Sequence, residues 1–137
     1  MNKKPMVAVI GSTIFDFVAF ASRMPETGET VKGEDFGMFP GGKGANQAVQ
    51  VSRLGASCYL ASMVGQDFMG KAILKSLRQA SVKTDYVFTH PRVPTACCCI
   101  HVAGGQNRII IALQANLEFS PDTLTQVEPL IQKSDLV

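Results

Sequence analysis

The residues best suited to do chemistry lie in one glycine-rich segment, Pro40-Gly41-Gly42-Lys43-Gly44-Ala45-Asn46-Gln47-Ala48. Glycines let a backbone approach a ligand closely, and a helix that begins just after them presents unpaired N–H groups. One chemistry that fits is phosphate binding at a helix N-terminus. The other is polyol binding, in which backbone N–H groups and the Asn46 amide meet sugar hydroxyls. A glycine-rich turn with only a structural role is the alternative to both.

The phosphate interpretation has a near match in the P-loop, whose glycine and lysine spacing residues 37–44 follow. However, Gly44 stands where a P-loop carries Ser or Thr, and that hydroxyl coordinates Mg²⁺. The strand that should lead into the loop is also weak, since Gly37 interrupts it. We therefore expect that this segment is not a nucleotide-binding P-loop.

A carboxylate, Asp16, is placed to join the glycine-rich segment. It follows the apolar run at residues 6–10, which predicts a strand buried on both faces of a parallel sheet. Ligands of open α/β sheets bind beyond the carboxyl ends of such strands. A carboxylate can accept hydrogen bonds from two neighbouring sugar hydroxyls. A solvated loop aspartate is the plainer alternative.

The elements that would position these residues alternate between strand and helix. The patterns predict strands at 6–10 and 57–64, a weaker strand within 30–39, and helices at 43–54 and 68–80. Later, two strands at 95–102 and 108–113 flank Gly104-Gly105 and predict a β-hairpin. Ser120-Pro121-Asp122 is typical of a helix start. The order predicts an α/β domain.

Composition excludes several classes of protein. The chain has 137 residues, 46% of them hydrophobic and 18% charged, with a net charge of +2, which favours a globular chain over a nucleic-acid or membrane-surface binder. No apolar run approaches the roughly 20 residues that span a bilayer, and no secretory leader is predicted.

The cysteines do not form a metal-binding pattern. Cys97, Cys98 and Cys99 are consecutive, so neighbouring side chains point to opposite faces of a strand and cannot converge on one metal. Free thiols predict a reducing compartment, the cytoplasm.

Taken in order, these motifs resemble the N-terminal signature of the ribokinase-like (PfkB) carbohydrate kinases. The matching residues are Gly11-Ser12 with Asp16, Pro25-Glu26-Thr27-Gly28-Glu29-Thr30, the segment 41–48, Gly55, Val64-Gly65-Gln66-Asp67 with Gly70, Gly105-Gln106-Asn107 and Ala115-Asn116. The resemblance implies a three-layer α/β/α sandwich with a small β-sheet lid, formed by segments at about 17–39 and 95–113. It further implies that residues 1–137 are the N-terminal part of a single domain, truncated after that half.

The resemblance implies transfer of the ATP γ-phosphate to the 5-hydroxyl of D-ribose, with Mg²⁺. By position, Asp16 would accept hydrogen bonds from sugar hydroxyls, Gly42 and Lys43 would contact the sugar, and Asn46 would pair with another hydroxyl. The lid often dimerises in this family, which implies a homodimer. Ile14 stands where some members carry an asparagine that touches the sugar, so the choice of ribose over another sugar is open.

The family's catalytic aspartate lies in a Gly-Ala-Gly-Asp segment, and these 137 residues contain none. Its nucleotide pocket and its monovalent-cation loop also belong to the C-terminal half. We therefore expect a chain that holds sugar-binding residues but does not catalyse phosphorylation by itself. The alternatives are a non-catalytic sugar-binding or lid-dimerisation fragment, and another PfkB sugar or nucleoside kinase.

Overall fold

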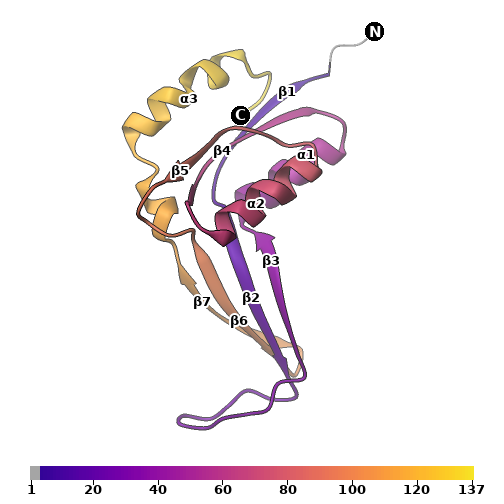
Figure 1. Cartoon of the computed structure of the whole chain (residues 1–137). Coiled ribbons are helices and arrows are strands. Elements are labelled where there is room, and N and C mark those ends of the chain that lie inside the picture. The colour runs from indigo at the N-terminus through magenta and orange to yellow at the C-terminus, as the bar shows by residue number, and fades with distance from the viewer. Residues whose placement is uncertain (1–3) are drawn as a thin grey trace.

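A computed structural model describes residues 4–137, which form two β-sheets with helices packed around the first (Figure 1). The first sheet is parallel, with β1 (Met6–Ile10) and β5 (Lys83–His90) on either side of β4 (Ser57–Gly65). β4 is buried along most of its length because helices cover both faces of the sheet. Ala8 pairs with Tyr59, and Ala61 pairs with Tyr86.

Two helices, α1 (Lys43–Arg53) and α2 (Phe68–Gln79), pack on one face of this sheet, and α3 (Pro121–Lys133) packs on the other. The larger core contains buried side chains of β4 and of both helices on the first face, among them Leu60, Val64 and Ile73. The smaller core joins Ala61 of β4 to Val127 of α3. Figure 1 shows α3 apart from α1 and α2. The three layers confirm the predicted α/β/α arrangement.

Local signals explain where two of the helices begin. Asp67 caps α2 by accepting a hydrogen bond from the Gly70 N–H at 2.8 Å. Ser120 caps α3 through the Thr123 N–H at 3.3 Å, and Pro121 follows at the first helical position, as predicted. α1 differs, because Gly42 precedes it and no side chain caps it.

The second sheet has the strand order β3-β2-β6-β7 and projects away from the helical layers (Figure 1). Its strands are β2 (Ile14–Ala21), β3 (Asp35–Gly41), β6 (Cys97–Ala103) and β7 (Gln106–Ala112). β2 pairs in parallel with β6, whereas the other two pairs are antiparallel. β6 and β7 form the predicted hairpin around Gly104-Gly105. This sheet therefore joins segments that lie far apart in the sequence.

The structure differs from the sequence predictions in three elements. β5 was not predicted, because its sequence has an apolar run of only three residues, 86–88; in the structure Val87 is its one buried residue. The weak strand expected within residues 30–39 begins only at Asp35 and continues to Gly41. A short 3-10 helix, η1 (Gln114–Glu118), was also not anticipated.

The three consecutive cysteines differ in exposure as alternation predicts. Cys98 is buried, Cys97 is partly buried and Cys99 is exposed, and all are free thiols. Among residues 4–137, no helix is both long and apolar enough to cross a membrane. The prediction that the chain carries no secretory leader falls partly on residues 1–3, which lie outside the described residues.

Candidate functional site

Asp16 lies on β2, the strand that continues from the end of β1 into the second sheet. It pairs with Phe39 of β3 on one side and with Cys98 of β6 on the other. The Cys98 thiol lies 2.9 Å from Asp16 Oδ1. Oδ2 lies against Gly41, where a Cβ atom would come within 2.4 Å of it. Only a glycine at residue 41 therefore leaves this space to the carboxylate.

The glycine-rich turn packs directly against the segment that connects β1 to β2. Gly42 has a φ of 98°, and a Cβ there would lie 2.6 Å from the Ser12 carbonyl oxygen. Gly44 and Gly11 approach each other equally closely, since a Cβ on Gly44 would lie 2.5 Å from the Gly11 carbonyl carbon. These glycines are required by a close approach of two backbones, which gives them a structural reason independent of any ligand.

The first turn of α1 carries three of the four predicted site residues. Gly42 precedes the helix, Lys43 begins it, and the Asn46 N–H donates to the Gly42 carbonyl at 2.9 Å. The side chains of Lys43 and Asn46 are exposed. Because Gly41 touches Asp16, the chain brings this turn and the Asp16 carboxylate to one junction between the two sheets.

The strand before the glycine-rich turn argues against a P-loop. A P-loop connects a strand of a parallel sheet to a helix. Here β3 leads into the turn, and it is an edge strand of the second sheet that pairs antiparallel with β2. The geometry of residues 37–44 therefore departs from a P-loop, as the sequence predicted.

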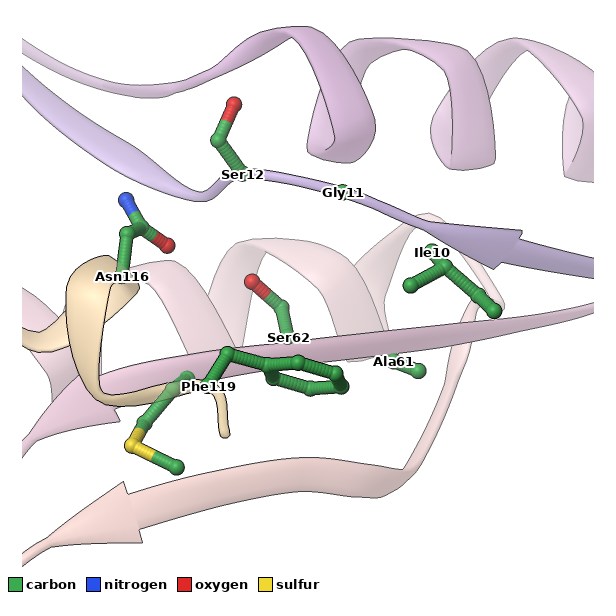
Figure 2. A pocket seen from close by; sticks show the side chains of 8 residues that line it. Ile10, Gly11, Ser12, Ala61, Ser62, Asn116 and Phe119 are labelled. Carbon is green, nitrogen blue, oxygen red and sulfur yellow. The ribbon is translucent and has the colours of Figure 1, made fainter. Parts of the chain in front are cut away.

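A cleft of about 300 Å³ lies on the other side of the β1–β2 connection (Figure 2). Figure 2 shows Asn116, Ser62 and Phe119 along it, with Gly11 and Ser12 between them and α1. None of the four predicted site residues lines this cleft. The sugar-binding prediction therefore concerns the opposite side of the connection, where Asp16 and Gly41 meet.

Asn116 anchors the connection between β1 and β2. Its Nδ2 donates to the Thr13 carbonyl at 2.8 Å, and its Oδ1 lies 3.4 Å from the Thr13 N–H. The buried Thr13 hydroxyl in turn lies 3.2 Å from the Ser62 hydroxyl. Asn116 was among the residues of the resemblance, but it was given no role there. Its partner, Thr13, lies 103 positions away in the sequence, so no local pattern indicates the contact.

A second anchor, also not predicted from the sequence, lies where β6 begins. Asp67 accepts hydrogen bonds from the backbone N–H and the hydroxyl of Thr95, as well as from Gly70. Burial disfavours the charged form of Asp67, but these hydrogen bonds outweigh it and hold the pKa of the carboxyl below its usual value. Asp67 thereby joins α2 to the second sheet.

The described residues do not fit a resident metal site. Within residues 4–137, no group of three or more His, Cys, Asp or Glu side chains is arranged to hold a metal ion. Asp16 faces Cys98, whose neutral thiol is a hydrogen-bond donor to it. We therefore assign no Mg²⁺ ligand to this chain and derive no step through the metal.

Comparison with known proteins relates this geometry to one family. Residues 4–137 match the profile described as pfkB family carbohydrate kinase. The chain is 42% identical to the ribokinase of Lactococcus lactis over 132 residues and 39% identical to that of Bacillus subtilis over 131 residues. Each alignment covers 96% of this chain but only 44% and 45% of the relative.

A solved structure of Arabidopsis thaliana ribokinase, complexed with ribose and ATP, is similar with a TM-score of 0.73 and 34% identity. That alignment covers 82% of this chain and 37% of the plant protein. The chain thus spans less than half the length of the relatives it matches.

Proposed function

Because the chain belongs to the pfkB family of carbohydrate kinases, we propose that it forms the sugar-binding part of a ribokinase, an ATP-dependent phosphotransferase acting on the 5-hydroxyl of D-ribose. The observation that carries this proposal is the carboxylate of Asp16, seated against Gly41 at the start of the glycine-rich turn. The ribose and ATP bound by the plant relative support the same substrates for the whole enzyme.

In this proposal, each predicted residue has a distinct task. Asp16 accepts hydrogen bonds from two neighbouring sugar hydroxyls, a role that suits a carboxylate because its two oxygens offer about four acceptor sites. Gly42 and Lys43 contact the sugar from the turn, and the exposed amide of Asn46 donates to and accepts from another hydroxyl. The rigid packing of Gly44 on Gly11 holds this turn in place before the sugar arrives.

The second sheet is proposed to act as the lid of the sugar site. It carries Asp16 on β2, one of its two inner strands, and a cover over the bound sugar would exclude water that competes for the phosphoryl group. Its outer strands expose large apolar side chains, including Phe36 at 57% and Ile110 at 73%. Such exposure supports the proposed homodimer through the lid.

ATP is proposed as the phosphoryl donor of the whole enzyme, and the 137-residue chain alone is proposed to be inactive. The sequence contains no Gly-Ala-Gly-Asp segment that would supply the family's catalytic base. ATP, when bound, supplies the transferred phosphoryl group, while the described residues bind and orient the sugar. The cytoplasm is the proposed location, supported by four free thiols.

The proposal is tested by calorimetric titration of the 137-residue chain with D-ribose, accompanied by a coupled assay for ATP consumption. We expect saturable binding without turnover. Asp16→Ala should weaken binding about tenfold or more, since hydrogen bonds to a charged group are among the stronger ones. Lys83→Ala is the control, because Lys83 lies on β5 and contacts Tyr59 instead of the sugar site.

Two results would contradict the proposal. A chain that unfolds cooperatively but gives no heat with ribose would exclude the sugar site, and turnover of ATP with ribose would exclude the inactive state.

A panel of pentoses and hexoses tests the second candidate, another sugar as substrate. The observation that favours another sugar is Ile14, which pairs with Gly41 beside Asp16 and stands where some family members carry a sugar-contacting asparagine.

A further inference from the structure

The side chain of Asp16 is held from two sides by residues that the proposed sugar contacts do not include. Cys98 lies beside it on β6, in direct register, with its Sγ 2.9 Å from Oδ1. Gly41 lies on the other side, where a Cβ would come within 2.4 Å of Oδ2 and 3.5 Å of Oδ1. The two carboxylate oxygens therefore have different surroundings.

The chemistry of Cys98 makes it the donor in this pair. Its side chain is only 5% exposed, and burial, together with the hydrogen bond to Asp16 and the charge of Asp16, raises the pKa of the Cys98 thiol to about 12. At neutral pH the Cys98 side chain is thus an S–H, which donates to Oδ1 of Asp16. Neither neighbouring cysteine can replace it, since Cys97 and Cys99 point to the opposite face of β6.

We propose that Cys98 is a positioning residue of the sugar site, whose thiol donates to Oδ1 of Asp16 and so keeps the carboxylate turned toward the glycine-rich turn. With Oδ1 engaged, Oδ2 stays over Gly41, adjacent to Gly42, where the sugar hydroxyls are proposed to bind. The positioning role rests on the proposed function, because it assumes that Asp16 binds the sugar. The hydrogen bond between Cys98 and Asp16 is independent of that function.

The thiol contact also limits which groups can occupy the space beside Asp16. Cys98 is buried and in register with Asp16, so its sulfur packs beside the carboxylate on the same face of the sheet. Serine at this position keeps a donor with a smaller atom, whereas alanine removes the donor. The two substitutions therefore separate hydrogen bonding from space filling.

The first experiment is titration of the full chain and three variants with D-ribose. We expect Cys98→Ala to weaken binding about tenfold, in keeping with the loss of one hydrogen bond to a charged acceptor, and Cys98→Ser to stay within about threefold of the parent. Cys99→Ala is the matched control, because Cys99 is exposed and adjacent in sequence but on the other face. Equal affinities of the parent and Cys98→Ala would overturn the proposal.

The second experiment does not depend on sugar binding. The S–H stretching band of Cys98 is identified in infrared spectra by its loss in Cys98→Ala, and it should move toward the frequency of a free thiol in Asp16→Ala. A band that does not move would overturn the proposal, whatever the titration gives. A band that moves in a chain that gives no heat with ribose would contradict the proposed function while supporting the contact between Cys98 and Asp16.

Discussion

Thr95 donates two hydrogen bonds to Asp67, from its backbone N–H to Oδ2 and from its hydroxyl to Oδ1, each at 2.7 Å. The same hydroxyl accepts a hydrogen bond from the Gly65 N–H at 2.9 Å, at the end of β4. One carboxylate and one hydroxyl therefore connect α2, the first sheet and the start of β6. This connection sets where the second sheet leaves the α/β layers.

The Asp67 carboxylate predicts a specific dependence of stability on pH. Its pKa is lowered in the folded chain, so its contribution is present above the unfolded value near 4 and is lost as pH falls through the folded value. Asp67→Asn should lower the free energy of unfolding by about 1–3 kcal/mol at pH 6 and flatten its decline toward pH 2. Urea unfolding of parent and variant between pH 2 and 6 measures both effects.

The control for that measurement is Asp85→Asn, because Asp85 is an exposed acid on β5. It should leave the free energy of unfolding within about 0.5 kcal/mol of the parent. Parallel pH profiles for the parent and Asp67→Asn would show that the hydrogen bonds of Thr95 do not favour the ionised carboxylate.

The contact between Gly44 and Gly11 predicts an unusual effect of alanine in a helix. Alanine normally stabilises a helix by about 1 kcal/mol relative to glycine. Here the new Cβ would lie 2.5 Å from the Gly11 carbonyl carbon, a backbone atom that cannot move alone, so Gly44→Ala should destabilise the chain by about 1–3 kcal/mol. Thermal unfolding followed by circular dichroism measures the sign.

Gln47→Ala is the matched change, since Gln47 is exposed on the same helix. It should be neutral or slightly stabilising. Ribose binding should weaken in Gly44→Ala as well, because the turn that carries Gly42 would shift away from Asp16. A higher melting temperature for Gly44→Ala than for the parent would contradict the close approach of the Gly44 and Gly11 backbones.

Asn116 lines the cleft in Figure 2 and holds Thr13, the residue just before β2, so its loss should loosen the start of that strand. Asn116→Ala removes the donor to the Thr13 carbonyl and should cost about 1–2 kcal/mol in the free energy of unfolding. Amide hydrogen exchange should rise at residues 11–13 more than in β5. Asn107→Ala, in the exposed hairpin, is the comparison, and equal exchange in both variants would contradict the anchoring role.

Local signals predicted several elements of the fold, among them α1, which carries Lys43 and Asn46, but they predicted no strand at β2, which carries Asp16. The start of α3 was predicted because Ser120 and Pro121 act on their own neighbours. The hairpin was predicted because two strand patterns flank Gly104-Gly105, and both glycines adopt positive φ angles in the structure. β5 was missed because its sequence has an apolar run of only three residues, 86–88, and no alternation of apolar and polar residues. In this strand, pairing with β4 overrides a weak local pattern.

The sequence by itself determined the glycine-rich turn before α1, the alternation of strands and helices and the likeness to one kinase family, because these depend on residues close together in the chain. Only the tertiary structure decided which groups meet at Asp16. Cys98 lies 82 positions away from it, and Thr95 lies 28 positions from Asp67. Such contacts depend on β6 pairing in parallel with β2, and the register of strands distant in sequence is set by packing, which no local periodicity specifies.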